Sequence, residues 1–380
     1  MEQVVIYADP LAGLTRAATF GERLSIVHAE LLRRCPGAAR LAVALHDGKT
    51  GMLKTFAASP SDENPLVNYE ASIDEVHSLR DVAARGCARV VHDLAALNGK
   101  RPHSQQIRGH GFASSYTLPI FTNAVLVGFV FCDSVHKGYF RNGVVDQVEL
   151  FAQIVAQLVL RERSSLATLN AALRMAVGMV HVRDPETGNH LERMARYSRL
   201  IARELVRRGK CDYTDEQIEQ LFNFAPLHDI GKLGIPDRIL LKQGKLGEDE
   251  RTVMDTHTLI GRQMVDELAV NFGFQQIAHL GLLQALVEYH HEVLDGSGYP
   301  HGLSGAQIPL EARIVAVSDV FDALTSKRPY KESWPNSHAV AMLQLLAIDK
   351  LDADCVAALI DSHEEVACIQ QQFADAGLAA

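Results

Sequence analysis

The sequence of 380 residues lacks two features that would direct it to a membrane or out of the cell. No stretch approaches the roughly 18 uninterrupted apolar residues of a membrane-spanning helix. The opening MEQVVIYADP lacks the basic and then apolar pattern of a secretory signal. We therefore expect a cytoplasmic protein without a membrane span. Apolar residues make up 47% of the chain and charged residues 22%, which is enough for two domains with separate cores.

Cysteine is scarce and scattered. No two cysteines have the C-x-x-C spacing, so the sequence indicates neither a disulfide framework nor a thiolate metal site. Most of them are expected to be small buried hydrophobes. The six are Cys35, Cys87, Cys132, Cys211, Cys355 and Cys368.

Positive charge is also in short supply, because 37 Lys and Arg residues stand against 46 Asp and Glu and the formal net charge is −9. This balance argues against broad binding of nucleic-acid polymers or of anionic membranes. It leaves room for a local basic pocket that holds a small phosphorylated ligand.

Between about residue 38 and residue 135 the apolar residues follow the pattern of strands. The segments are ARLAVALHDG, MLKTFAAS, ARVVHDL, SSYTLPIF and AVLVGFVFCDS, separated by Gly, Asn, Asp and Ser. Helical stretches lie before, between and after them, which predicts an α+β domain with a central antiparallel sheet over residues 1–143. This element order resembles a GAF domain, a ligand-sensing or dimerising module. The histidines of this half show no ligand spacing, so both roles stay open.

A long helix, or two helices in series, is predicted over residues 144–180. The run that begins VVDQVELFAQIV contains no proline over nearly forty residues, and its apolar positions recur at spacings of three and four. Such a helix could transmit motion between the two halves or pair with a second copy in a homodimer. The alternative is that it packs on each domain in turn.

The remaining residues, 181–380, are helical in pattern and gather imidazoles and carboxylates without cysteine. This donor set suits iron or manganese better than a structural zinc. A single histidine on an apolar helix would more often be an ordinary core or surface residue. Buried together among apolar neighbours, however, charges at this density need a metal or a partner. The residues are Glu186, His190, His228, Asp229, His257, His290, His291 and Asp319.

Two doublets, His228–Asp229 and His290–His291, favour more than one ion. Adjacent residues of a helix diverge by about 100°, so the two members of a doublet do not chelate one ion comfortably. Asp229 is the natural bridging ligand. Glu186 and His190 share a face if a helix starts at Asp184 and Pro185, and could together help to hold a third ion.

At these residues the chain resembles the HD-GYP family, a branch of the HD superfamily of metal-dependent phosphohydrolases. The matching segments are HDIGK (228–232), HHEVLDGSGYP (290–300), ARIVAVSDVFDALTS (312–326) and RPYK (328–331). The resemblance implies an all-α domain that hydrolyses cyclic di-GMP to linear 5′-pGpG and, in some members, to GMP.

The resemblance also implies a ligand set. The two-metal core would use His228, Asp229, His257, His290, His291 and Asp319, and Glu186 with His190 would help to bind a third ion. The cofactors would be two or three divalent ions, with iron favoured and manganese as the alternative. Metal-bound water would supply the nucleophile, and Lys232, close to Asp229, would stabilise the phosphate oxygens or the leaving alkoxide.

Other residues are predicted around this core. Arg328 and Lys331 would bind the substrate phosphates, and Arg313 would either join them or pair with a buried carboxylate. Asp322 would orient a ligand or a basic residue. The DGSGYP loop is a turn by composition, and Tyr299 on it would stack or hydrogen-bond over the site, with partner proteins as another use of the loop.

Two rivals to an active cyclic di-GMP phosphodiesterase remain. One is a catalytically weak module that binds cyclic dinucleotide and signals through contacts, and the other is a phosphohydrolase for a related cyclic dinucleotide or a nucleoside triphosphate. The apparent completeness of the ligand set favours activity, and the GSGYP and RPYK segments favour cyclic di-GMP.

Overall fold

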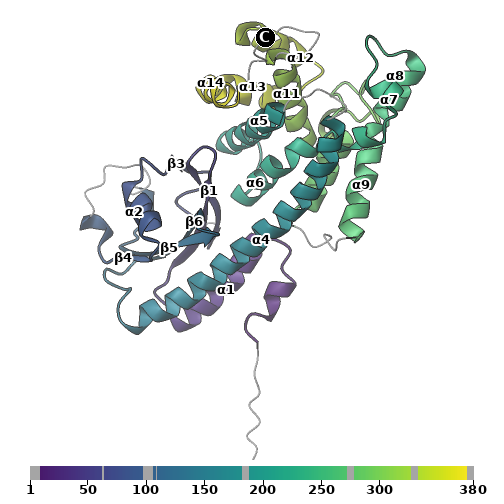
Figure 1. Cartoon of the computed structure of the whole chain (residues 1–380). Helices are drawn as coiled ribbons and strands as arrows, with labels where there is room; N and C mark the ends of the chain where they lie inside the picture. Colours follow the sequence, from purple (N-terminus) through teal and green to yellow (C-terminus); the bar gives the residue numbers. More distant parts are fainter. Residues whose placement is uncertain are drawn as a thin grey trace, which may run out of the picture. The chain divides into compact units, whose positions relative to one another are not determined.

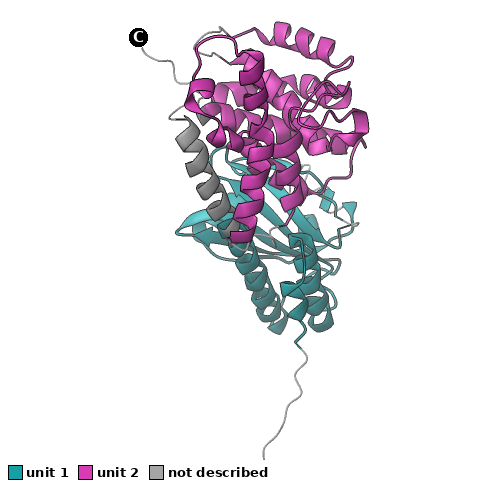
Figure 2. Ribbon diagram, turned by 90° about the vertical axis from the view of Figure 1, so that its right-hand side faces the viewer, with its two compact units in different colours: residues 1–165 teal, residues 166–380 magenta. Residues whose placement is uncertain are grey.

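The computed structural model describes residues 9–61, 64–96, 106–107, 109–181, 188–271, 278–326 and 333–374, with the backbone alone for 165–181 and 188. The chain divides into two compact units, Met1–Ser165 and Leu166–Ala380 (Figure 2). This boundary falls inside the long helix for which the sequence predicts a separate segment over 144–180.

The N-terminal unit combines one sheet with flanking helices (Figure 1). Its elements in chain order are η1 (Ala12–Thr15), α1 (Phe20–Arg34), β1 (Arg40–Asp47), β2 (Met52–Ser59), β3 (Glu70–Ser72), α2 (His77–Arg85), β4 (Arg89–Val91), η2 (Leu94–Ala96), β5 (Ser114–Thr122), β6 (Val125–Ser134) and the first part of α4 (Gly143–His181).

The six strands form an antiparallel sheet in the order β3-β2-β1-β6-β5-β4. The predicted hairpin is β5–β6, which closes with Thr122 opposite Val125. The strand β1 lies in the middle of the sheet, between β2 and β6. The prediction of an α+β domain with a central antiparallel sheet is therefore confirmed.

The two faces of the sheet have different helical covers. Alternate residues of β1 point to one face, where Leu41, Val43 and Leu45 join the core that α1 and α4 complete. The other face carries Phe129 and is covered by α2 through Leu79 and Val82. The start of α1 is fixed by a capping box, because the Thr19 hydroxyl accepts the Glu22 amide at 3.1 Å while the Glu22 carboxylate accepts the Thr19 amide.

The long helix is continuous, so the structure has one helix, α4, where the sequence allowed two in series. Its first part, Gly143–Ser164, is long and apolar enough to cross a membrane by length and composition alone. One face of that part is nevertheless buried in the N-terminal core through Val148, Ala152 and Val155. The apolar stripe is thus accounted for by packing within the N-terminal unit.

The C-terminal unit is built from helices (Figure 1). They are α5 (Gly188–Arg207), α6 (Asp215–Phe224), η3 (Ala225–Leu227), η4 (Ile230–Gly234), α7 (Asp237–Leu240), α8 (Glu248–Asp255), α9 (His257–Asn271), α10 (Leu280–Tyr289), η6 (Gly305–Gln307), α11 (Leu310–Thr325), α12 (Asn336–Leu346), α13 (Ala353–Asp361) and α14 (His363–Gln372).

The helix α5 is central to this unit, since it packs against α6, α11 and α13. Its apolar residues recur at helical spacing, and Met194, Tyr197 and Ile201 are fully buried. The Tyr197 ring meets the Phe321 ring of α11 edge to face at 5.3 Å. Among the described residues of this unit the one bridge of strand type joins Asp295 to Ser304, so the prediction of an all-helical domain is confirmed for them.

A buried ion pair stabilises the middle of the sheet and can be tested. Arg40 of β1 lies opposite Asp133 of β6, and its guanidinium donates to the carboxylate at 2.6 Å with both side chains buried. We expect Asp133→Ala to destabilise the N-terminal unit by about 3–5 kcal/mol, because it leaves a buried charge without its counterion. Denaturant unfolding, with hydrogen exchange of the β1 and β6 amides to localise the loss, measures this.

The matched control is the double replacement Arg40→Met with Asp133→Leu, which removes both charges and should cost less than the single change. A single variant as stable as the wild type would contradict the buried pairing.

Candidate metal centre

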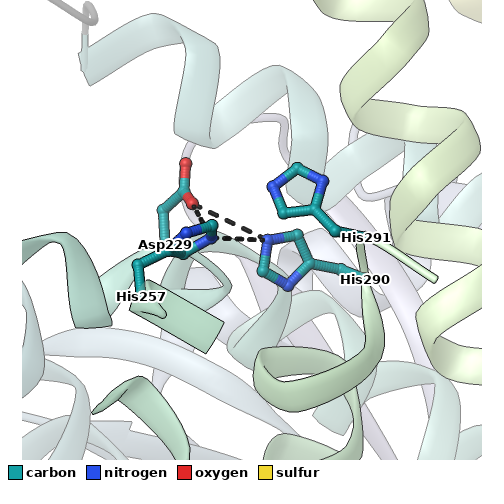
Figure 3. A group of neighbouring side chains, drawn as sticks. All are labelled: Asp229, His257, His290 and His291. Carbon is teal, nitrogen blue, oxygen red and sulfur yellow. Dashed lines mark hydrogen bonds and ion pairs between the residues drawn. The ribbon is translucent and has the colours of Figure 1, made fainter. Parts of the chain in front are cut away.

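Seven of the predicted ligands lie in two groups inside the C-terminal unit. In each group the candidate ligand atoms lie within 4.8 Å of one another. Group A consists of Asp229, His257, His290 and His291. Figure 3 shows these four side chains, with dashed lines between Asp229, His257 and His290. Group B consists of His190, His228 and Asp319.

The two groups adjoin because the His228–Asp229 doublet contributes one residue to each. The doublet stands between the 3-10 turns η3 and η4 and not within an α-helix. His228 Nε2 lies 3.3 Å from Asp229 Oδ2, and the rings of His228 and His290 are 5.0 Å apart, edge to face. The inference that the His228–Asp229 doublet serves more than one ion thus fits this geometry. The same inference for the His290–His291 doublet was wrong, because both residues lie in group A and follow the end of α10, where the divergence of adjacent helical residues does not apply.

Close backbone packing brings His257 to Asp229. A Cβ atom added to Gly231 would lie 1.8 Å from the carbonyl oxygen of His257 and 2.4 Å from the amide nitrogen of Gly261. Only glycine therefore allows the HDIGK turn to approach the start of α9 this closely. The result is that His257 Nε2 lies 3.2 Å from Asp229 Oδ1.

Backbone carbonyls set the proton position on three of the imidazoles. A carbonyl oxygen only accepts, so a ring nitrogen that bonds to it must carry the hydrogen, and the other nitrogen then offers a lone pair. In each ring the Nδ1–H group is the donor: His228 donates to Ala225 O at 3.0 Å, His257 to Met254 O at 2.9 Å and His290 to Leu286 O at 3.0 Å.

Two of these lone pairs, those of His257 and His290, converge in group A. His257 Nε2 and His290 Nε2 are 3.4 Å apart, and Asp229 Oδ1 is 3.2 Å from the first and 3.7 Å from the second. Two lone pairs and a carboxylate oxygen at such distances repel one another unless a cation lies among them. Imidazole nitrogen and carboxylate oxygen are donors of the borderline divalent ions. The residues present therefore fit a metal ion.

The charge states of group A agree with this role. Burial lowers the pKa of His290, and burial together with the neighbouring His290 lowers the pKa of His291 well below its usual range. Burial alone would raise the pKa of the Asp229 carboxyl, but the Lys232 ammonium and neighbouring imidazoles outweigh it and hold that pKa well below its ordinary value. These directions favour neutral imidazoles at His290 and His291 and an ionised carboxylate at Asp229.

Lys232 lies beside the metal groups as predicted. Its Nζ donates to Asp229 Oδ2 at 2.7 Å, and its side chain remains partly exposed. A cation at this position can also reach an anionic substrate that approaches from solvent.

Group B depends on Asp322 for its orientation. His190 Nε2 lies 3.9 Å from Asp319 Oδ1, and His190 Nδ1 donates to Asp322 Oδ2 at 2.7 Å. The buried Asp322 also accepts from Arg193. Burial would raise the pKa of Asp322, but its bonds with His190 and Arg193 lower it overall. The sequence expected Asp322 to orient a ligand or a basic residue, and it contacts one of each.

The DGSGYP loop both reverses the chain and reaches group A. The Tyr299 ring lies 4.8 Å from the His291 ring and 6.1 Å from the His257 ring. A Cβ atom on Gly298 would meet the His291 carbonyl oxygen at 2.5 Å, so glycine allows the loop to pack on the histidine turn. The loop therefore has both predicted features: it reverses the chain, and it places Tyr299 beside group A.

Of the remaining predicted residues, the structure describes only Arg313. Arg313 donates to the Asp352 carboxylate and to the Ile308 carbonyl oxygen, the latter at 3.0 Å. This contact matches the expected pairing with a carboxylate, while a substrate-binding role for Arg313 stays a prediction. Glu186, Arg328 and Lys331 lie outside the described residues.

Two residues that the sequence analysis did not select also hold the site together. Arg193 binds Asp322, and Glu292 accepts the amides of His301 at 2.7 Å and Leu303 at 2.8 Å, which anchors the loop after Tyr299. Two features of the sequence could have revealed them. Arg193 follows His190 with the spacing H-x-x-R, and Glu292 is the third residue of the HHE segment.

The helical unit and its two groups define a domain suited to bind several metal ions through histidine and aspartate. The HD domain family matches residues 152–355, more than half of the chain. The chain therefore belongs to the HD domain family, and the resemblance to HD proteins inferred from the motifs is confirmed at this level.

Curated relatives are similar to about half of the chain. A cyclic di-GMP phosphodiesterase response regulator, RpfG, of Xanthomonas campestris pv. campestris is 43% identical over 216 residues, 57% of this chain and 52% of that protein. A cyclic di-GMP phosphodiesterase of Thermotoga maritima is 38% identical over 193 residues, 51% and 49% of the two chains. A 3'3'-cGAMP-specific phosphodiesterase 3 of Vibrio cholerae is 38% identical over 181 residues, 48% and 36%. The chain spans about half the length of the first two.

Solved structures resemble the chain more distantly. The GAF domain of a phosphoenolpyruvate-protein phosphotransferase from Coxiella burnetii has a TM-score of 0.33 at 16% identity and covers 42% of this chain and 95% of that one. A GAF domain/HD domain protein from Geobacter sulfurreducens has a TM-score of 0.30 at 14% identity, with 37% and 94% covered. The α+β fold of the N-terminal unit rests on its own sheet and helices and not on these neighbours.

The packing at Gly231 gives a test of the metal groups. We expect Gly231→Ala to weaken metal binding by group A, since the new methyl group would push the start of α9, and with it His257, away from Asp229. Overpacking of this kind also lowers stability by about 1–3 kcal/mol. Titration with Mn²⁺ and thermal unfolding measure the two effects.

The control is Gly281→Ala in α10, where a Cβ atom meets nothing within 4 Å. That change should keep wild-type metal binding and leave stability equal or higher by about 0.5–1 kcal/mol. Wild-type Mn²⁺ affinity in Gly231→Ala would refute the positioning role of this contact.

Proposed function

We propose that the C-terminal unit is a metal-dependent phosphodiesterase that hydrolyses cyclic di-GMP to linear 5′-pGpG, with GMP as a further product still to be tested. The observation that carries the proposal is the convergence of His257 Nε2, His290 Nε2 and Asp229 Oδ1 on one point, with their tautomers held by backbone carbonyls. Membership of the HD domain family and the names of the relatives support this reaction class.

The bound ions would supply an activated water as nucleophile and would offset charge on the phosphoryl oxygens. The chain's own residues do the rest. Asp229 lies between the two groups and can bridge them, and the partly exposed Lys232 can donate to a phosphate oxygen or to the leaving alkoxide. Tyr299 presents its ring beside His291, where a guanine base could stack. Arg328 and Lys331, expected at the substrate phosphates, remain predictions.

For the metals we propose iron, with manganese as the alternative, and three ions per chain. The described donors are imidazole nitrogen and carboxylate oxygen without thiolate, which suits these ions. Because His190 Nδ1 donates to Asp322, only the Nε2 atom of His190 can bind a metal, and that atom lies in group B. The ion that Glu186 would help to hold is therefore the one at group B.

Elemental analysis of protein purified without added metal tests the metal content. We expect about three ions per chain with iron in excess of manganese and zinc. A content near two would remove the role given to Glu186 and His190 in a third site, and a predominance of zinc would refute the assignment to iron or manganese.

The cyclic dinucleotide itself needs a separate experiment, because one relative is named for 3'3'-cGAMP. We expect the metal-loaded protein to convert cyclic di-GMP faster than 3'3'-cGAMP, with the products resolved by chromatography over time. Preferential cleavage of 3'3'-cGAMP would change the substrate. Tight binding of cyclic di-GMP without cleavage would instead favour the rival function, a signalling module that binds the nucleotide.

The variant Asp229→Ala tests the bridging residue. It should abolish turnover and reduce bound metal, because group A loses its carboxylate and the link to group B. The matched control is Asp249→Ala in α8, an exposed acidic residue outside both groups, which should keep activity and metal content. Retained turnover in Asp229→Ala would remove the role assigned to this residue.

The remaining expectations concern the whole protein and stay predictions. They are regulation by the GAF-like unit through ligand binding or dimerisation, a homodimer through that unit and α4, protein partners at the DGSGYP loop, and a cytoplasmic location.

A further inference from the structure

Arg193 lies at the meeting point of three segments of the C-terminal unit. It follows His190 by three positions on α5, so the two side chains share one face of the helix. Arg193 is only 4% exposed. A buried guanidinium next to a metal group needs a structural or functional reason, because an unpaired charge there would be costly.

It makes two hydrogen bonds to Asp322 of α11. Arg193 Nε donates to Asp322 Oδ1 at 2.6 Å, and a terminal nitrogen of the same guanidinium donates to Asp322 Oδ2 at 3.0 Å. This two-point contact fixes both the position and the plane of the carboxylate, which a single ammonium group could not do.

Asp322 passes this orientation to His190. Its Oδ2 atom accepts from His190 Nδ1 at 2.7 Å, so the plane of the carboxylate decides where the imidazole turns its Nε2 atom. That Nε2 atom faces Asp319 and belongs to group B.

Arg193 also contacts the two chain segments that come after α11 and α14. One terminal nitrogen donates to Ser326 Oγ at 2.7 Å, and the Ser326 hydroxyl in turn donates to Asp322 Oδ2 at 2.9 Å. The other terminal nitrogen donates to the Phe373 carbonyl oxygen at 2.9 Å. Ser326 is the last described residue before the segment that carries Arg328 and Lys331.

We propose that Arg193 is a positioning residue for group B: it clamps Asp322, which orients His190 toward the ion that His190, His228 and Asp319 would share. The inference rests on the metal centre proposed above. It predicts that loss of the clamp weakens one class of metal site and leaves group A, which Arg193 does not orient, unchanged.

The test uses the full chain and Mn²⁺ alone as the probe, titrated by calorimetry into metal-depleted protein. Arg193→Lys keeps the charge but loses the two-point contact. We expect the Mn²⁺ affinity of one class of site to fall about 10- to 100-fold, while the remaining sites keep theirs. Raised Mn²⁺ should restore activity, since the altered site still has its three ligands.

Two further variants separate positioning from general stability. Arg199→Lys is the control, because Arg199 is a buried arginine on the same helix that lies 3.5 Å from Glu219 and not at Asp322; it should titrate like the wild type. Asp322→Asn should weaken the same class of site, and combined with Arg193→Lys it should add little, because both changes act on one chain of contacts. Asp322→Asn alone carries the test if Arg193→Lys does not fold.

Wild-type Mn²⁺ binding in Arg193→Lys would overturn the proposal. An equal loss at every site, beyond rescue by Mn²⁺, would also overturn it and assign Arg193 a purely structural role. The titration needs no turnover, so a wild-type chain that binds Mn²⁺ but leaves cyclic di-GMP intact would refute the proposed substrate and still allow this test.

Discussion

The metal groups of the C-terminal unit are built around one unfavourable interaction. Several lone pairs point at one another in the protein interior, and their electrostatic repulsion raises the free energy of the metal-free fold. His257 and His290 bond their Nδ1 atoms to carbonyls of their own helical turns, so neither ring can relieve the contact between the Nε2 atoms by exchanging its tautomer. Asp229 adds negative charge to the same point. In a low-dielectric interior such an arrangement is unfavourable by itself and favourable around a cation. A bound metal ion would relieve this repulsion and would thereby also stabilise the folded unit.

The surrounding structure holds these donors through close backbone packing and through hydrogen bonds of buried side chains. Glycines let the backbone of the HDIGK turn touch α9, and let the DGSGYP loop touch the histidine turn after α10. Glu292 anchors that loop through two amides, and Arg193 fixes the carboxylate that aims His190. Four of the imidazoles, those of His190, His228, His257 and His290, are thus placed by hydrogen bonds to the backbone or to a buried carboxylate. Such rigidity is what a site that must keep several ions at fixed spacing requires.

The sequence predicted those parts of the site whose residues are neighbours along the chain. The doublets identified His228, Asp229, His290 and His291, because adjacent ligands are visible in any window of the chain. It also predicted the sheet, the long helix and the helical second half from their periods. It failed to select Arg193, whose partners Asp322 and Phe373 are 129 and 180 positions away. The 3-10 geometry at the HD doublet likewise depends on packing against α9, which no local pattern reveals.

Charge explains how an acidic chain could bind the anionic substrate proposed above. Asp229 and Asp319 bring two negative charges to groups A and B, so even two of the proposed divalent ions would give these ligands and ions together a net charge of about +2. This local excess would oppose the net charge of −9 over the whole chain and would attract the two phosphates of a cyclic dinucleotide. Cyclic di-GMP and 3'3'-cGAMP carry the same phosphates, however, so the metal groups cannot distinguish them. If a cyclic dinucleotide is the substrate, discrimination between its bases would have to come from side chains other than the metal ligands, such as Tyr299, whose ring lies 4.8 Å from that of His291.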